Sequence, residues 1–306
     1  MSQYYTGLDV SMNETAICTV NDKGKVVFED SVTTDPKEID KCLKTAGFPI
    51  EKMSLESGSM SHWLMKELLA LGWKISCMDA RSIATVLALK QNKTDRNDAR
   101  GIAEAVRSHS SYVREVYQKS QESVDLGTLL SARRSLVRQR TVLSNTMRGL
   151  LKTFGLCLGG STVEKFPFLI RKKIAEQWPQ SLIEKSAKEE VISSQVKAYP
   201  ALALEALLIP FETLTIELKK IDLVLKKTVK KDDVLKRLMT APGVGYLTAL
   251  TYKVIIDEPT RFKNARAVGA YLGCVLPCMH PGKPNDKDVF LKEALKNYGP
   301  YLPELA

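Results

Sequence analysis

The chain has 306 residues, of which 44% are hydrophobic and 26% are charged, with a formal net charge of +10. This composition supports a full core and excludes a disordered or collagen-like protein. No apolar run approaches the roughly 18 residues of a membrane helix, and residues 1–14 do not resemble a secretory leader, so we expect a cytoplasmic protein without a membrane partner. The cysteines and histidines lack metal-ligand spacing, which favours reduced thiols over disulfides or zinc.

The positive charge is concentrated in the middle of the chain. Residues 1–118 carry 15 Lys and Arg against 16 Asp and Glu, whereas residues 119–237 carry 22 against 13. An acid-bearing first part joined to a basic second part suits an enzyme that acts on a polyanion, because cations attract phosphates and carboxylates hold metal ions. A basic helical face that is only solvated is the alternative.

The first part of the chain alternates segments typical of strands and of helices. Such alternation predicts an α/β fold with a central sheet covered by helices. The expected elements, in chain order, are a β-hairpin formed by 4–18 and 24–28 around a turn at 21–24, a helix over 36–46, a strand over 52–57, a helix over 61–71 and a strand over 73–78.

The remainder of the chain has helical periodicity. We expect helices over 95–109 and 121–154 and a break at 155–161. Helical periodicity resumes over 183–238, with interruptions at Pro200 and Pro210. Within it, the segment 214–234 has the apolar stripe and charged flanks of a long helix that pairs with a partner.

Four carboxylates form the most informative pattern in the sequence. Asp9 lies inside an apolar strand, where a charge is costly unless it is paired or binds a cation, and Glu56 ends a second strand. Asp95 and Asp98 follow at the three-residue spacing that puts both on one face of a helix. If the four converge at one end of the sheet, they can hold Mg²⁺ ions for phosphodiester chemistry. Alternatively, Asp95 and Asp98 only stabilise a helix start, by about 0.3–1 kcal/mol each.

The segments LDVS around Asp9, LES around Glu56 and KTDRNDA around Asp95 and Asp98 together resemble the DEDD transposases of bacterial insertion sequences. These are relatives of the Piv-type DNA invertases, and their N-terminal domain is similar to the RuvC Holliday-junction resolvase. The resemblance runs from about residue 4 to about residue 277. It implies an RNase H-like domain in which the four acids are catalytic and bind Mg²⁺, a DNA substrate, and a structured guide RNA.

A second motif, LMTAPGVGYLTA, covers residues 238–249. Its Pro-Gly-x-Gly sequence between two helical stretches exposes backbone N–H groups at a helix start, so Gly243 and Gly245 are candidates for binding a nucleic-acid phosphate. The motif resembles a helix-hairpin-helix, and residues 261–273 continue like the C-terminal domain of the transposase family. A tight turn between helices without a ligand is the alternative.

Arginines are frequent in the helix predicted after residue 121. Arg134, Arg138 and Arg148 lie roughly on one face at helical spacing, and we expect them to contact nucleic acid. Scattered solvation of the helix is the alternative.

The transposase family carries a nucleophilic serine in a segment like ASGE, followed by a basic GRISKRG-like stretch. Neither occurs in this chain, whose last serine is Ser194, so no residue is assigned as the nucleophilic serine. The codons of Met279–Ala294, read one frame out of register, allow ASGETERQGRISKRG. We therefore hypothesise a frameshift between about Cys274 and Met279.

These observations predict four regions. They are an RNase H-like α/β domain at 1–155, a basic, partly coiled-coil helical segment at 156–237 that mediates homo-oligomerisation, a C-terminal transposase domain remnant at 238–279 and an aberrant tail at 280–306. The predicted function is Mg²⁺-dependent DNA transposition or site-specific recombination, impaired in this copy. A RuvC-like structure-specific endonuclease, which requires only water and metal, and a catalytically inactive nucleic-acid-binding protein are the alternatives.

Overall fold

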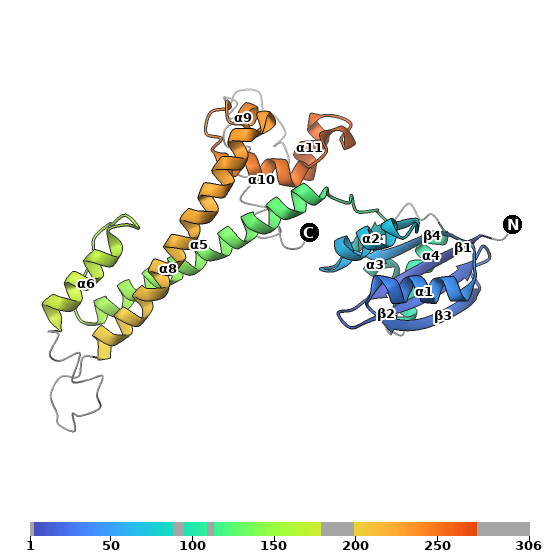
Figure 1. Cartoon of the computed structure of the whole chain (residues 1–306), viewed down its shortest axis with the longest axis horizontal. Coiled ribbons are helices and arrows are strands. Elements are labelled where there is room, and N and C mark those ends of the chain that lie inside the picture. Colours follow the sequence, from blue (N-terminus) through green and yellow to red (C-terminus); the bar gives the residue numbers. More distant parts are fainter. Residues whose placement is uncertain (1–2, 88–94, 109–112, 179–198, 274–306) are drawn as a thin grey trace, which may run out of the picture. The chain divides into compact units, whose positions relative to one another are not determined.

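The computed structural model describes residues 3–87, 95–108, 113–178 and 199–273. Contacts between Cα atoms divide them into two compact units, which we call the sheet unit (residues 3–121) and the helical unit (residues 122–273). Figure 1 shows the elements of each unit along the chain. The division differs from the boundary predicted at residue 155, because the helix that begins at Gln121 packs with the later helices. The boundaries of the predicted domains stay a prediction.

The sheet unit is built on a mixed five-stranded sheet with the strand order β3-β2-β1-β4-β5. β1 pairs antiparallel with β2 and parallel with β4, and β4 continues parallel to β5. The predicted α/β fold with a central sheet is confirmed. The strands are β1 (Tyr4–Val10), β2 (Glu14–Asn21), β3 (Val26–Thr33), β4 (Ile50–Glu56) and β5 (Ile75–Met78).

The predicted hairpin is wrong in one respect, since residues 4–18 form parts of two strands. The chain reverses at 11–13, where Ser11 donates both its N–H and its hydroxyl to the carbonyl oxygen of Glu14. The turn predicted at 21–24 is confirmed and connects β2 to β3. The Asn21 side chain accepts two backbone N–H groups there, and Gly24 adopts a φ of 77°.

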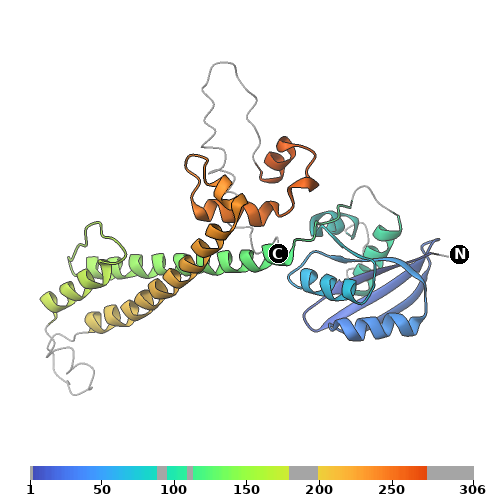
Figure 2. The same cartoon turned by 45° about the horizontal axis from the view of Figure 1, so that its top comes forward.

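Helices cover both faces of the sheet, as Figures 1 and 2 show. One face packs against α1 (Pro36–Ala46) and α2 (Ser61–Ala70) through the buried residues Leu8, Leu43 and Leu55. The opposite face packs against α4 through Ala99, Ile102 and Ala103. The elements on this second face are α3 (Ala80–Leu87), which was not predicted, and α4 (Asp95–Arg107).

The helical unit follows from Glu122, and its two longest helices cross each other in both views (Figures 1 and 2). The break predicted at 155–161 is confirmed, because residues 154–165 form no helix. None of the described helices is long and apolar enough to cross a membrane. The helices are α5 (Gln121–Thr153), α6 (Phe166–Gln177), α8 (Tyr199–Lys231), α9 (Asp233–Leu238), α10 (Tyr246–Ile256) and α11 (Ala265–Tyr271), with a short 3-10 turn at Pro259–Arg261.

The interruption of α8 predicted at Pro210 is wrong, because the helix continues through it. Proline lacks the N–H that would bond to the carbonyl of residue 206. Ala206 and Pro210 are both exposed, so water can satisfy that carbonyl. Packing of the buried side of α8, which carries Leu208, Phe211 and Leu218, compensates for the missing backbone hydrogen bond. Pro200 lies in the first turn of α8, where proline is tolerated.

Candidate functional site

Asp9 and Glu56 lie at the same edge of the sheet. β1 and β4 are parallel neighbours, and Leu8 pairs with Leu55 in their register. Asp9 and Glu56 directly follow this pair, so their Cα atoms are roughly 5 Å apart. Both side chains are half-buried. The carboxyl ends of two central strands therefore bring together two of the four predicted acids.

Asp9 and Glu56 also belong to the same face of the sheet. Leu8 and Leu55 pack against α1 and α2, and successive residues of a strand point to opposite faces. Asp9 and Glu56 therefore belong to the face covered by α4. Gly7 confirms this for β1, since a Cβ atom built on it would meet the backbone of α4.

The direction of α4 brings its first residues toward the same edge. Near its C-terminus, Arg107 donates a hydrogen bond of 3.1 Å to the carbonyl oxygen of Asp22 in the β2–β3 turn. That turn lies at the opposite end of β1, because Tyr4 pairs with Asn21. α4 therefore runs antiparallel to β1, and its N-terminus points toward the end of the strand that carries Asp9.

Asp98 lies in the first turn of α4 and is half-buried, beside the fully buried Ala99. Asp95 is the first residue of α4, and its side chain lies outside the described part of the structure. Among the described residues, no three His, Cys, Asp or Glu side chains are grouped closely enough to hold a metal ion. The structure thus brings Asp9 and Glu56 to one edge and directs the start of α4 toward it.

Hydrogen bonds fix the backbone where the strands end. The N–H of Ser57 donates to the carbonyl of Met78 at 2.8 Å, and the N–H of Ala80 donates to the Ser57 hydroxyl at 3.1 Å. These bonds hold the segment after Glu56 against the end of β5. Backbone fixed in this way limits how far the Glu56 carboxylate can move, which suits a site that needs defined ligand positions.

Carboxylates at this edge place negative charge near the Cys77 thiol. Burial raises the pKa of Cys77 to about 11, and the negative charges of Glu56 and Asp79 add to this effect while a hydrogen bond with Ser61 opposes it. A bound cation would offset this negative potential.

The donor chemistry fits a hard divalent cation. Asp9, Glu56 and Asp98 offer only carboxylate oxygens, which are the ligands that Mg²⁺ prefers. The Cys77 thiol lies on the opposite face of the sheet, because Cys77 pairs with Leu55 and packs with it against α1 and α2. The residues present therefore fit Mg²⁺ better than a thiophilic metal.

Two residues at this edge were missed in the sequence. Gly7 allows α4 to approach β1, and Ser57 fastens the end of β4 to β5. The signal for Gly7 is a glycine inside a strand pattern, which marks close approach of another backbone. No comparable signal exists for Ser57, because its partner Ala80 lies 23 residues away.

The three arginines predicted to contact nucleic acid have different environments. Arg138 is exposed, whereas Arg134 is half-buried and burial lowers its pKa. Arg148 donates hydrogen bonds of 3.0 Å to the carbonyls of Leu158 and Gly159 and to the Ser161 hydroxyl. The Arg148 guanidinium therefore holds the loop after α5 in place.

The Pro-Gly-x-Gly motif forms the turn between α9 and α10. Gly243 has a φ of 80°, which favours glycine, and Gly245 precedes α10 without a capping side chain. The Tyr246 hydroxyl donates to Asp222 at 3.0 Å, and Arg133 Nε donates to the same carboxylate at 2.6 Å. Burial would raise the pKa of Asp222, but these hydrogen bonds outweigh it and lower the pKa. The start of α10 is thus anchored to α5 and α8.

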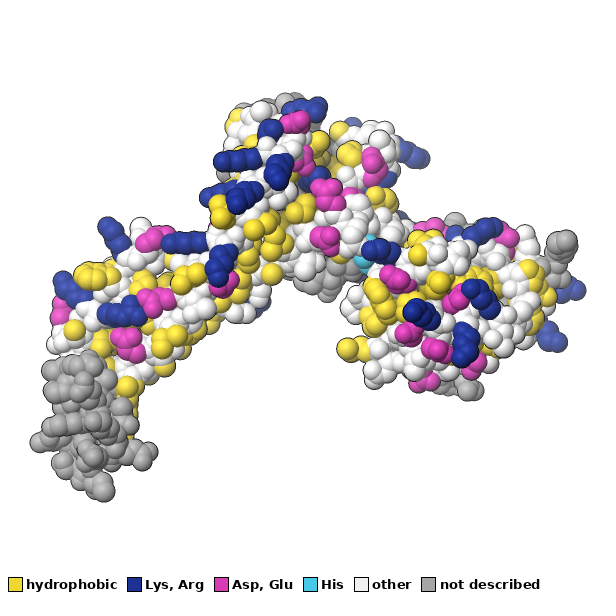
Figure 3. Space-filling model, in the orientation of Figure 1, with side chains coloured by type: hydrophobic (Ala, Val, Ile, Leu, Met, Phe, Trp, Pro, Cys, Tyr) yellow, Lys and Arg dark blue, Asp and Glu magenta, His cyan; other side chains and the backbone are white. Residues whose placement is uncertain are grey.

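Basic side chains gather on α8 and α9. Figure 3 shows lysines and arginines along the upper half of α8 and over α9. Only some of them are paired with acids, as Lys220 is with Glu217 and Lys236 is with Asp233. The exposed members are Lys219, Lys220, Lys226, Lys227, Lys230, Lys231, Lys236 and Arg237.

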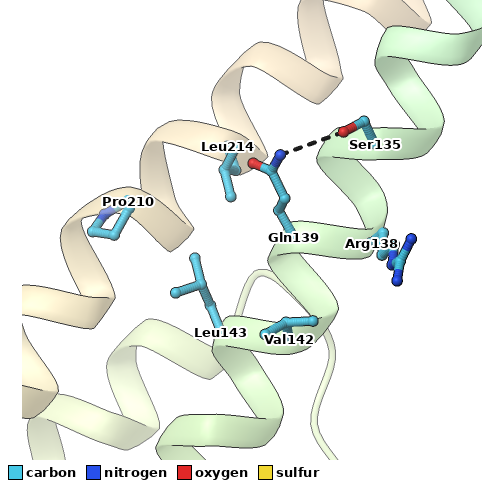
Figure 4. A pocket seen from close by; sticks show the side chains of 7 residues that line it. All are labelled: Ser135, Arg138, Gln139, Val142, Leu143, Pro210 and Leu214. Carbon is cyan, nitrogen blue, oxygen red and sulfur yellow. Dashed lines mark hydrogen bonds between the residues drawn. The ribbon is translucent and has the colours of Figure 1, made fainter.

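A groove of about 590 Å³ lies between α5 and α8. Figure 4 shows Val142 and Leu143 of α5 beside it, with Pro210 and Leu214 of α8 opposite. Its lining is mainly apolar, and the Arg138 side chain, which also lines it, points away from α8 (Figure 4). The groove contains no constellation of titratable groups and is therefore a weaker candidate for catalysis than the edge of the sheet.

Comparison with known proteins gives two family matches. Residues 6–155 match a DEDD transposase family named for IS110, and residues 235–280 match the transposase family IS116/IS110/IS902. The first match covers β1 to α5 and therefore includes all four acids. The second covers the turn between α9 and α10.

Individual relatives agree with these matches. The chain is 28% identical over 287 residues to the transposase for insertion sequence element IS1111A of Coxiella burnetii, covering 93% of this chain and 71% of that protein. It is 26% identical to a probable family 20 transposase of Pseudomonas aeruginosa, over 73% of this chain and 60% of the relative. Thermus thermophilus RuvC in complex with a Holliday junction aligns with 12% identity and a TM-score of 0.29, over 37% of this chain and 99% of RuvC.

Proposed function

Because the chain belongs to the DEDD transposase family of insertion sequences, we propose that its sheet unit cleaves DNA phosphodiester bonds with Mg²⁺ held by Asp9, Glu56, Asp95 and Asp98. The observation that supports this most strongly is the position of Asp9 and Glu56 on adjacent parallel strands. They share the face of the sheet that is covered by α4, whose first residue is Asp95.

The four carboxylates have two tasks in this proposal. They bind the cations, and they fix the scissile phosphate relative to the strand ends. The bound metal supplies activation of an attacking oxygen and stabilisation of the leaving one. Glu56 keeps its position because Ser57 fastens the end of β4 to β5. Asp9 keeps its position because the following turn is closed by hydrogen bonds from Ser11 to Glu14.

We propose DNA and a structured guide RNA as partners of the helical unit. The exposed lysines of α8 and α9 support this, because clustered cations bind phosphates without base specificity. Arg134, Arg138, Gly243 and the backbone N–H groups at the start of α10 after Gly245 add to the proposed nucleic-acid surface. Arg148 contributes indirectly, by holding the loop after α5.

We propose homo-oligomerisation through α8. Apolar side chains at positions 209, 216 and 223 recur every seven residues and are more than half exposed. A seven-residue repeat of this kind supports packing against another helix. Light scattering should report an oligomer for the wild-type chain and a smaller species for Ile216→Glu combined with Leu223→Glu. A monomeric wild-type protein would contradict this part.

The departure of residues 279–294 from the family's serine segment supports impaired strand transfer and a second candidate function. No serine follows Ser194 in the chain. An RNase H-like nuclease that uses water and metal does not need one, so a RuvC-like structure-specific endonuclease remains the second candidate. A catalytically inactive nucleic-acid-binding protein is the third. Sequencing the gene across codons 270–306 tests the frameshift directly, because codons unable to encode the serine segment in the shifted frame would exclude it.

The decisive experiment measures nicking of supercoiled and branched DNA by the full chain with and without Mg²⁺. We expect Asp9→Asn and Glu56→Gln to lower the cleavage rate at least about 100-fold, since metal catalysis supplies several kcal/mol of transition-state stabilisation. Glu51→Gln is the matched control, because Glu51 lies on the same strand and forms an exposed ion pair with Lys74. Unchanged cleavage by both site variants would refute the metal site, whereas DNA binding without any cleavage would favour the inactive binding protein.

A further inference from the structure

Gly7 lies in the middle of β1, two residues before Asp9, and the backbone of α4 packs directly against it. A Cβ atom at this position would lie 2.1 Å from the carbonyl oxygen of Ala99 and 2.4 Å from the amide nitrogen of Ala103. Both neighbours are backbone atoms of α4, so a rotation of a side chain cannot relieve the contact. Ala99 and Ala103 are themselves fully buried.

This contact has a definite relation to the four acids. From Gly7 to Asp9 the strand advances about 6.6 Å. From Ala99 back to Asp95 the helix covers about 6 Å in the same direction, because α4 runs antiparallel to β1. The contact at Gly7 therefore sets the distance at which the first turn of α4, with Asp95 and Asp98, faces the strand ends with Asp9 and Glu56.

We propose that Gly7 is a positioning residue of the metal site: its missing side chain sets the spacing between the carboxylates of β1 and β4 and those of α4. This inference rests on the function proposed above. In proteins a Cβ atom essentially never comes within 3.0 Å of a non-bonded heavy atom of another segment, so any side chain at position 7 would separate α4 from β1 by roughly 1 Å. Mg²⁺ requires near-octahedral geometry with oxygen distances of about 2.0–2.1 Å, and it does not tolerate such a displacement.

The test compares metal binding with folding in the full-length protein. Mn²⁺ binding is followed by electron paramagnetic resonance, and the fold by circular dichroism and urea unfolding. We expect Gly7→Ala to weaken Mn²⁺ binding at least tenfold and to raise the Mg²⁺ concentration for half-maximal cleavage by a similar factor, with the helical and strand content retained. Ala103→Ser adds a single atom to the buried face of α4 that packs on the sheet and should give a smaller shift in the same direction.

Leu43→Ala is the matched control. Leu43 is buried on the opposite face of the sheet, so this variant destabilises the unit without altering the contact between α4 and β1. We expect its Mn²⁺ affinity to equal that of the wild type. A purely structural role for Gly7 would instead give Gly7→Ala and Leu43→Ala the same metal affinity, and this outcome would overturn the inference.

Asp9→Asn separates failure of this inference from failure of the proposed function. Loss of Mn²⁺ binding by Asp9→Asn together with wild-type binding by Gly7→Ala would leave the metal site intact and refute the role of Gly7. Wild-type Mn²⁺ binding by Asp9→Asn would refute the metal site and, with it, the inference. If Gly7→Ala does not fold, Ala103→Ser decides, and unchanged metal affinity in this variant would contradict the role proposed for the contact.

Discussion

Replacing Asp222 with asparagine should destabilise the helical unit measurably. Asp222 accepts hydrogen bonds from Arg133 Nε at 2.6 Å and from the Tyr246 hydroxyl at 3.0 Å. The Asp222 and Arg133 side chains are only 27% and 21% exposed. Hydrogen bonds to charged groups contribute about 1.5–3 kcal/mol when buried, whereas exposed pairs contribute little. Because the pair is partly exposed, we expect Asp222→Asn to lower the free energy of unfolding by about 2 kcal/mol.

Urea unfolding at pH 7, followed by far-ultraviolet circular dichroism, measures this loss. Asp233→Asn is the control, because the Asp233 side chain is 83% exposed and its ion pair with Lys236 lies at the surface. We expect no measurable change for Asp233→Asn. The experiment also tests the anchoring of α10, since Tyr246 is the first residue of that helix.

The pH dependence gives the prediction a second test. Net, the hydrogen bonds lower the pKa of Asp222 below its ordinary value of 3.8. A lowered pKa means that the unfolded chain binds the proton more readily, so the stabilisation is complete above the ordinary value and is lost as pH falls through the folded one. The difference between wild type and Asp222→Asn should therefore shrink in acid. Equal stability at pH 7, or a difference that does not change with pH, would refute the reasoning.

The remaining predictions concern α8 and the arginines of α5. Pro210→Ala restores a backbone donor inside α8 and should raise the free energy of unfolding by about 1–3 kcal/mol in the same urea assay; a loss would contradict it. Arg148→Met removes three hydrogen bonds that hold the loop after α5 and should cost about 2 kcal/mol of stability. Arg138→Gln should leave stability unchanged, weaken DNA binding and reduce the slope of log K against log salt by about 1. The reverse result, with Arg148 acting on binding and Arg138 on stability, would exclude this division of roles.

Local signals in the sequence were sufficient to predict the bounds of an element where capping residues mark both of its ends. Helix α1 was predicted with its observed bounds, because Asp35 caps it, Pro36 begins it and Gly47 ends it in a left-handed conformation. The reversal at 11–13 was missed because its residues carry neither glycine nor proline. The prediction of a helix break at Pro210 was wrong, because it rested on the local preference of proline alone. Burial of Leu208 and Phe211 keeps α8 continuous.

The candidate site was predictable in its residue types but not in its geometry. Placement in apolar strands singles out Asp9 and Glu56, and three-residue spacing singles out Asp95 and Asp98. The register of β1 with β4 was needed to bring Asp9 next to Glu56. Helical periodicity does not identify tertiary partners. It could therefore not predict that Arg148 donates hydrogen bonds to the loop after α5, or that Arg133 donates to Asp222, 89 residues away.

The central claim is that Asp9, Glu56 and the acids at the start of α4 share divalent cations. Crystals of the full-length protein grown with Mn²⁺, with diffraction recorded at the manganese absorption edge, test it directly. The account predicts an anomalous peak within roughly 2.0–2.3 Å of carboxylate oxygens from both Asp9 and Glu56, with Asp95 or Asp98 completing the ligands. Bound Mn²⁺ that touches none of these carboxylates, or an Asp9 carboxylate remote from the start of α4, would contradict it.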